Sequence, residues 1–227
     1  MATTKIDRAQ VADTALRLLN ELGLDGLTVR AIAKELGVQA PALYWHFKNK
    51  QALLDEMATV MYRRLMADGV PGAGAGTWQD LLRAVNRALR TMLLSYRDGA
   101  KVYGGARFTG TDHAESMELY LGVMLEAGFE LRDAARAALT TYAYTMGFVA
   151  EEQGTEPRPQ EQREAVDVSA RAARLAAYPL AAAAGPELFE GFDERFEEGL
   201  GVVVAGIEAT YRRSAKSSPS WGSPLAS

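Results

Sequence analysis

Residues 28–50 read TVRAIAKELGVQAPALYWHFKNK and decide the fold of the N-terminal part of the chain. Apolar residues at helical spacing predict two short helices, one from Thr28 to Gly37 and one that starts near Pro41. Thr28 can cap the free amides of the first helix, and Gly37 suits a tight turn that needs a positive φ. Ala33 is small enough for two helices to cross there. The pattern predicts a helix-turn-helix; an ordinary three-helix core without a ligand is the alternative.

The rest of the chain also shows helical spacing, and no segment shows the strict alternation of a half-buried strand. Two glycine-rich stretches and one that contains prolines interrupt the helices, at 70–78, 98–111 and 153–160. The sequence therefore predicts an all-α protein. Besides the two short helices, we expect helices at about 7–23, 50–67, 78–96, 112–127, 131–152, 161–178 and 187–213.

Composition excludes several classes of site. The 227 residues contain no cysteine and only two histidines, His46 and His113, so we expect no disulfide, no metal site and no cofactor. The start of the chain lacks the apolar run of a signal peptide, and no stretch approaches the ~20 apolar residues of a membrane span. We expect a cytoplasmic protein with no membrane partner.

Charge is distributed unevenly along the chain. Residues 1–67 carry nine Lys and Arg against seven Asp and Glu, whereas the remaining 160 residues carry sixteen against twenty-two. A slightly basic head on an acidic body is compatible with DNA binding at one end, although the net charge is −4.

The second helix of a helix-turn-helix lies in the DNA major groove, and the first crosses the backbone. Leu43 points inward in this arrangement, while the polar and aromatic residues around it can contact sugars, thymine methyl groups or phosphates. For Trp45, packing against the next helix is an equal alternative; for His46 a phosphate contact is favoured. The predicted DNA-binding residues are Thr28, Arg30, Gln39, Ala40, Pro41, Ala42, Tyr44, Trp45, His46, Lys48 and Lys50.

Three segments carry a family resemblance. GLTVRAIAKELGVQAPALYWHFKNKQALL (26–54) resembles the DNA-binding head of the tetracycline-repressor (TetR) family. TWQDLLRAVNRALRTMLLSYRDGAKVYGGARFTGT (77–111) and, more weakly, TYAYTMGFVAEEQ (141–153) resemble the ligand-binding domain of that family's tetracycline-repressor branch. The similarity covers most of residues 5–213 with gaps.

The resemblance implies a domain organisation and a function. It implies a DNA-binding domain at 1–50, a connecting helix at 51–67, and a ligand-binding and dimerisation domain at 68–213; composition predicts a disordered tail at 214–227. It also implies a homodimer, joined through the helices at 131–152 and 187–213, that represses transcription at a palindromic double-stranded DNA operator until a small-molecule inducer binds. An activator or a ligand-independent regulator of the same fold is the alternative, and a core helix is the alternative for 187–213.

The resemblance also places an inducer pocket in the body. Where the family's magnesium–tetracycline site has a histidine ligand and an asparagine, this chain has Tyr103 and Val85, and Tyr is a poor magnesium ligand at neutral pH. The substitutions imply a small hydrophobic or aromatic, polyketide-like inducer, with Arg107 as an anchor for an anion or carbonyl. Core packing is the alternative for the aliphatic members. The predicted ligand-binding residues are Met66, Val85, Leu89, Tyr103, Arg107, Phe108, Leu119, Met146 and Glu151.

Two further inferences concern specificity and catalysis. The family's base-reading glutamine and threonine correspond to Ala40 and Ala42, which cannot hydrogen-bond to bases, so the operator sequence should differ. No nucleophile–base pair or metal constellation is present, so we expect no enzyme. We interpret His113 as a solvated residue in the first turn of its helix.

Overall fold

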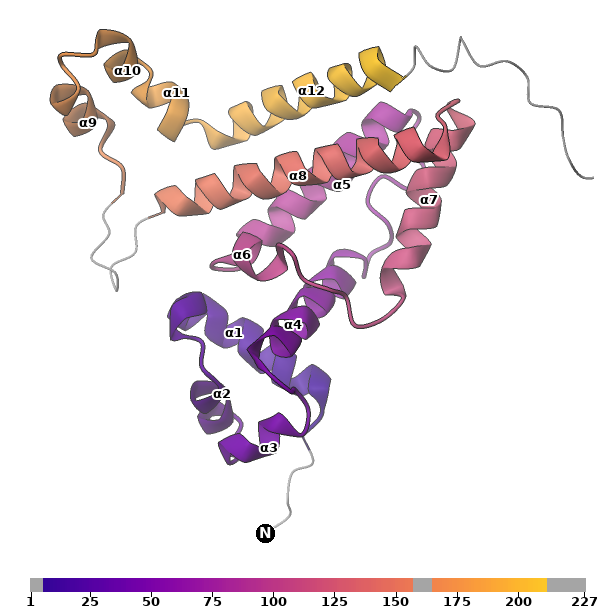
Figure 1. Cartoon of the computed structure of the whole chain (residues 1–227), viewed down its shortest axis with the longest axis vertical. Helices are drawn as coiled ribbons and strands as arrows, with labels where there is room; N and C mark the ends of the chain where they lie inside the picture. The colour runs from indigo at the N-terminus through magenta and orange to yellow at the C-terminus, as the bar shows by residue number, and fades with distance from the viewer. Residues whose placement is uncertain (1–5, 157–164, 212–227) are drawn as a thin grey trace, which may run out of the picture.

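The computed structural model describes residues 6–156 and 165–211 (Figure 1). All regular structure in these residues is α-helical, in twelve helices, which confirms the all-α prediction. The tail predicted to be disordered, 214–227, lies outside the described residues.

The N-terminal helices begin where the sequence supplies a capping side chain. The side-chain oxygens of Asp7, Thr28 and Asn49 accept hydrogen bonds from backbone N–H groups three residues further on, at 2.8, 3.1 and 2.8 Å. Gly23, with φ 71°, interrupts the helix that follows Asp7 where the sequence predicts its end. These helices are α1 (Arg8–Gly26), α2 (Val29–Glu35), α3 (Ala40–Tyr44) and α4 (Lys50–Leu65).

The helix-turn-helix prediction is confirmed by the packing of α2 and α3. Ile32, Ala33 and Leu43 are at most 3% exposed and join one apolar core with α1 and α4. Gly37 adopts φ 67° in the turn between the two helices, a conformation that favours glycine. Burial of these side chains fixes α3 against α1 and α4, and therefore fixes which face of α3 remains exposed.

The C-terminal part is a bundle in which α8 packs against both α5 and α12. Trp78, Phe129 and Phe196 are nearly fully buried in a second core that these helices share with α7. In Figure 1, α8 and α12 run side by side at the end of the molecule opposite α2 and α3. The main helices are α5 (Trp78–Leu94), α7 (Asp112–Glu126), α8 (Leu131–Thr155) and α12 (Phe192–Tyr211).

One predicted break proves to contain a helix. The glycine-rich segment 98–111 includes α6 (Gly99–Tyr103). A Cβ on Gly99 would lie only 2.1 Å from the carbonyl oxygen of Leu93, so glycine here allows α6 to start directly against the end of α5. Glycine therefore serves close packing at this position, and the segment separates α5 from α7 as predicted but contains a short helix that was not predicted.

Two predicted helices are shorter than expected. The described part of 161–178 contains only α9 (Val168–Arg174), and α10 (Pro179–Ala183) and α11 (Gly185–Phe189) follow it as separate short helices. The helix predicted at 187–213 starts only at Phe192, because Gly191 has φ 61° and separates α11 from α12.

Candidate DNA-binding surface and ligand cavity

The helix-turn-helix leaves large aromatic side chains in solvent. Trp45 is 88% exposed and Tyr44 is 57% exposed, immediately after the buried Leu43. The alternative that Trp45 packs against the next helix is therefore wrong. An exposed Trp next to an exposed Tyr and the exposed Lys48 and Lys50 is an unusual surface for a protein without a partner.

Four predicted DNA-binding residues surround one hollow between α2, α3 and α4. Thr28, Arg30, Tyr44 and Lys50 all line it, although they come from different helices. Tyr44 and the cationic Arg30 and Lys50 are therefore near enough to contact one stretch of nucleic acid backbone together.

The remaining predicted DNA-binding residues differ in how far they are exposed to solvent. Gln39 and Pro41 are exposed at the start of α3, whereas Ala40 and Ala42 are partly buried against the core of the head. His46 is half-buried, and its carbonyl oxygen accepts a hydrogen bond from Arg8 Nη1 at 2.7 Å. The end of the recognition helix is thus tied to α1.

The C-terminal part contains a cavity of about 350 Å³ between α4, α5, α7 and α8. This volume lies near the lower end of the range for small-molecule sites, roughly 300–1,000 Å³. The cavity wall is formed by Tyr62, Leu65, Met66, Leu82, Val85, Asn86, Leu89, Tyr103, Ala106, Phe108, His113, Ser116, Met117, Tyr120, Leu121, Ala135, Ala138, Leu139, Thr141 and Tyr142.

Five of the nine predicted ligand-binding residues meet in this wall: Met66, Val85, Leu89, Tyr103 and Phe108. They come from α4, α5, α6 and the loop after α6, so the fold brings together residues that are up to 42 positions apart in the sequence. Their side chains are apolar apart from the Tyr103 hydroxyl.

The other four predicted residues are not part of the wall. Arg107 is exposed, and its backbone N–H donates to Asp55 Oδ1 at 3.1 Å. Glu151 is also exposed, near the end of α8, and Leu119 and Met146 are partly buried outside the cavity. The side chain of Arg107 therefore does not line the cavity, and its role as an anchor stays a prediction.

The sequence did not lead us to predict that one face of α7 lines the cavity. His113, Ser116, Met117 and Tyr120 all line the cavity. Their spacing of three, four and seven residues is the signal that would have grouped them on one helix face. The interpretation of His113 as a solvated first-turn residue was wrong: its Nδ1 is buried, and its ring lies 5.6 Å from that of Phe108.

Several polar atoms around the cavity are paired within the protein. Thr145 Oγ1 donates to Asn86 Oδ1 at 2.8 Å, and the hydroxyls of Tyr62 and Ser116 are hydrogen-bonded to each other. Burial raises the pKa of Tyr103 far above its ordinary value, so this phenol stays neutral at physiological pH. Among the described residues, no three His, Cys, Asp or Glu side chains form a group that could hold a metal ion.

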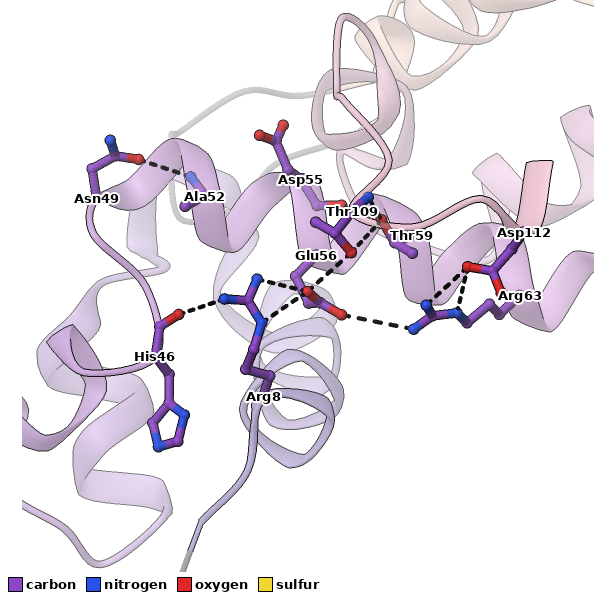
Figure 2. A network of polar contacts seen from close by, with 10 residues as sticks. All are labelled: Arg8, His46, Asn49, Ala52, Asp55, Glu56, Thr59, Arg63, Thr109 and Asp112. Atoms are coloured by element: carbon purple, nitrogen blue, oxygen red, sulfur yellow. Dashed lines mark hydrogen bonds and ion pairs between the residues drawn. The ribbon is translucent and has the colours of Figure 1, made fainter. Parts of the chain in front are cut away.

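A polar network around α4 connects the loop after α6 and the start of α7 to the head (Figure 2). At its centre is Glu56 of α4, a carboxylate in a residue only 5% exposed. Glu56 Oε2 accepts from Arg8 Nη2 at 2.8 Å and from the hydroxyl of Thr109 at 3.1 Å. Arg8 in turn donates to the carbonyl oxygen of His46, so three segments meet at one buried charge.

The same network holds the loop that follows α6 against α4. The N–H groups of Arg107 and Thr109 donate to Asp55 Oδ1 and Thr59 Oγ1, at 3.1 and 3.0 Å. Phe108, between them, lines the cavity.

A second connection runs through α7. Arg63 of α4 donates to Asp112 Oδ2 at 2.9 Å, next to the cavity residue His113. The loop after α6 and the start of α7, which both carry cavity residues, are therefore hydrogen-bonded to α4.

This combination of an exposed helix-turn-helix and a helical body with an apolar cavity is the architecture of a DNA-binding regulator. The profile for "Bacterial regulatory proteins, tetR family" matches residues 11–57, and the profile for "Tetracyclin repressor-like, C-terminal domain" matches residues 70–211. The chain belongs to the TetR family of transcriptional regulators, which confirms the resemblance and places it with regulators rather than enzymes.

Individual relatives agree with this placement. The chain is 41% identical over 205 residues to the tetracycline repressor protein class A from transposon 1721 of Escherichia coli, with 90% of this chain and 91% of that protein covered. A "possible TetR family transcriptional regulator" from Streptomyces coelicolor A3(2) superposes with a TM-score of 0.76 at 38% identity, over 89% and 99% of the chains. The class A TetR in complex with 5a,6-anhydrotetracycline and magnesium gives a TM-score of 0.64 at 36% identity, over 88% and 96%.

None of the helices in residues 6–156 and 165–211 combines the length and the apolar character needed to cross a bilayer.

Proposed function

We propose that this chain is a ligand-responsive transcriptional repressor that binds a palindromic operator as a homodimer and is released by a small hydrophobic or aromatic inducer. The observation that carries the proposal is the network centred on Glu56, because it connects Thr109, next to the cavity residue Phe108, to the carbonyl oxygen of His46, just after α3. In this proposal residues 1–50 bind DNA, 51–67 connect, and 68–213 bind the inducer and the second protomer.

The release mechanism follows from what α4 contacts. A ligand in the cavity presses on Phe108 and on the His113 face of α7, and the loop after α6 shifts relative to Asp55, Glu56 and Thr59. Since Glu56 also holds Arg8, a shift of α4 changes the position of the head. A ligand that favours the non-binding arrangement by a few kcal/mol would release most of the DNA.

Dimerisation through α8 and α12 is supported by their exposed apolar side chains. Leu139 of α8 is 64% exposed and Val202 of α12 is 73% exposed. Gly201 and Gly206 are also on α12, have open space around them, and would permit a close approach of helices, whereas Gly199 packs against Tyr144 of the same chain. A second copy would cover these side chains and would double the number of DNA contacts.

Magnesium does not fit the residues of this cavity. Only His113, among the wall residues, is a usual metal ligand, and the buried phenol of Tyr103 stays protonated. The class A relative is seen with anhydrotetracycline and magnesium, but this cavity favours a compound that binds without the metal.

The fold alone also suits an activator or a regulator that needs no ligand. The apolar cavity favours the ligand-responsive form over the second of these. A mobility-shift assay on the DNA upstream of the chain's own gene tests the choice, with hydrophobic aromatic compounds added to the shifted complex.

A variant with a filled cavity makes that assay specific. Ala138→Phe places a ring in the cavity wall, so we expect DNA binding to persist and release to be lost. Ala173→Phe, on the exposed surface of α9, is the matched control and should respond like the unmodified chain. Release of both variants by the same compound at the same concentration would mean that the ligand binds elsewhere.

A further inference from the structure

Besides the contacts made through α4, the head meets the body through the last turns of α1. Asn20 Oδ1 accepts from the N–H of Arg97 at 2.8 Å, and its amide donates to the carbonyl oxygen of Ser95 at 3.3 Å. The N–H of Leu24 donates to Asp98 Oδ2 at 3.0 Å. In Figure 1 this end of α1 lies next to α6. We call the contact formed by these five residues the α1 joint.

The carboxylate of Asp98 serves α1 instead of its own helix. Asp98 stands at the N-cap of α6, where an aspartate usually accepts from an N–H of the first turn, but its side chain makes no such bond. The residue is 4% exposed and has a φ of 57°, the one positive φ outside glycine in the described part of the chain. Such a conformation persists where the surrounding contacts require it. The geometry therefore commits this buried carboxylate to the backbone of α1.

The end of α1 is shaped to meet the turn after α5. Gly23 interrupts α1 with a φ of 71°, directly before Leu24. A Cβ on Gly23 would lie 2.9 Å from Arg97 Nε, and Arg97 Nη1 donates to the carbonyl oxygen of Glu21 at 3.4 Å. Glycine thus combines the positive φ of the kink with room for the guanidinium against it.

The body side of the joint is fixed by a second buried side chain. Gln153 of α8, 3% exposed, donates to the carbonyl oxygens of Leu93 and Tyr96 at 3.2 and 2.8 Å. Its Oε1 accepts from the N–H of Ala100 at 3.1 Å. The turn that carries Asp98 is therefore tied to α8, and α6, which begins in the joint, ends at the cavity residue Tyr103.

A head attached through α4 alone could turn about the axis of that helix, and a contact away from the axis stops this rotation. We propose that Asp98 is a positioning residue: through the α1 joint it fixes the angle between head and body. Because α6 connects the joint to Tyr103, the cavity gains a second route to the head that does not pass through α4. This inference rests on the proposed function and deepens it, since the head angle in a dimer sets the spacing of the half-sites that are bound.

Distances between spin labels on the full chain measure the head angle without DNA or ligand. The chain contains no cysteine, so labels attach only where cysteines are introduced. Lys34→Cys on α2 and Thr91→Cys on α5 are both at exposed residues and give a head–body pair. Thr91→Cys with Glu118→Cys on α7 gives a reference pair within the body. Mixing with an excess of unlabelled chain restricts the measurement to distances within one protomer.

Four variants assign the head angle to the joint. Asp98→Gly keeps a backbone that favours positive φ and removes the carboxylate, so we expect a broader head–body distribution and an unchanged reference distance. Asn20→Ala, on the exposed surface of α1, should broaden it without altering α6. Asp98→Asn tolerates the same backbone and keeps an acceptor for Leu24, so it should retain the narrow distribution. Lys101→Gln is the control, because it removes the 3.0 Å ion pair with Asp98 Oδ1 and leaves the contact with α1 intact.

Each outcome of the distance measurements decides the inference. An unchanged head–body distribution in Asp98→Gly would overturn it, and so would equal broadening of the reference pair, which would mean that Asp98 only stabilises the body. Broadening in Lys101→Gln as large as in Asp98→Gly would assign the effect to the charge of the ion pair and would also overturn it.

Operator binding is scored separately. Asp98→Gly should weaken it by roughly two- to tenfold, because fewer heads hold the competent angle. Broadening without any loss of operator affinity would overturn the role of the joint in DNA binding. Broadening in a chain that no compound releases from DNA would refute the proposed function alone, whereas fixed distances in a chain that inducer does release would refute only this inference.

Discussion

The substitution Glu56→Gln removes one buried negative charge and keeps the shape of the side chain. The carboxylate accepts two hydrogen bonds from Arg8, at 3.2 and 2.8 Å, and lies 3.7 Å from Arg63 Nη1. It also accepts from the hydroxyl of Thr109. The variant removes the counter-charge of Arg8 and one of the two that surround Arg63, which keeps Asp112, so it should loosen the contact between the head, α4 and the cavity loop.

The loss in stability can be estimated from these contacts. Breaking a fully buried ion pair costs about 3–5 kcal/mol. The side chains of Arg8 and Arg63 are 46% and 45% exposed, however, so water partly replaces the lost partner. We expect a free energy of unfolding lower by about 1–2 kcal/mol, and a melting temperature lower by about 2–8 °C for a chain of this size.

The loss of the inducer's effect on operator binding should be larger than this modest destabilisation alone would cause. Allosteric coupling commonly amounts to about 1–3 kcal/mol, or a 5–150-fold change in affinity. Inducer lowers operator affinity by some factor in the unmodified chain. We expect this factor to be at least about fivefold smaller in Glu56→Gln. Fluorescence anisotropy of labelled operator DNA, with and without inducer, measures this ratio, and thermal unfolding measures stability.

A matched control is Glu21→Gln on α1, where an exposed glutamate pairs with Arg17 at 2.9 Å. It removes the same charge from a pair that contacts neither the cavity loop nor the recognition helix. Glu21→Gln should leave both readouts unchanged. A full inducer response in Glu56→Gln would refute the claim that this carboxylate couples the cavity to the head.

Three further predictions concern the DNA surface, the dimer and acid stability. Lys50→Ala should weaken operator binding and reduce the slope of log affinity against log salt by about one per head, as measured by anisotropy at several salt concentrations. Val202→Asp should convert a dimer to a monomer in light scattering, because it places a charge on an exposed apolar position of α12. Arg87 donates to Glu197 and holds the pKa of that carboxyl below its ordinary value of 4.5. Arg87→Gln should therefore lower stability by about 0.2–1 kcal/mol above pH 4.5, and the difference should vanish as the pH falls through the depressed pKa.

Each of these has a result that would contradict it. An unchanged salt slope would remove Lys50 from the phosphate contacts. A dimeric Val202→Asp would move the interface away from this face of α12. A stability difference for Arg87→Gln that persisted at pH 2 would mean that Arg87 stabilises the fold through packing rather than through the charge of Glu197.

Local chemistry made the head predictable from the sequence. Thr28 caps α2 through a hydrogen bond to the third residue on, and Gly37 has the positive φ that the turn requires. Such signals lie within a few residues of the feature that they specify. The inward position of Leu43 followed from the same spacing.

The body was less predictable because packing between distant helices decides it. The sequence predicts that Gly99 breaks a helix, yet in the structure it allows α6 to begin against Leu93. The rotation of α7 about its own axis decides that Tyr120, rather than its neighbour Leu119, lines the cavity. Helical spacing groups residues on a face but does not say which face meets the cavity.

The most direct test of the central claim is the dependence of operator release on magnesium. The shifted complex on the DNA upstream of the chain's own gene is titrated with an uncharged aromatic compound, anthraquinone, and with tetracycline, each in magnesium and in excess chelator. We expect the aromatic compound to release the DNA equally well with and without magnesium, and tetracycline with magnesium to leave the complex intact. Release by tetracycline that disappears with the chelator would show that the cavity accepts a metal chelate, and would contradict the account.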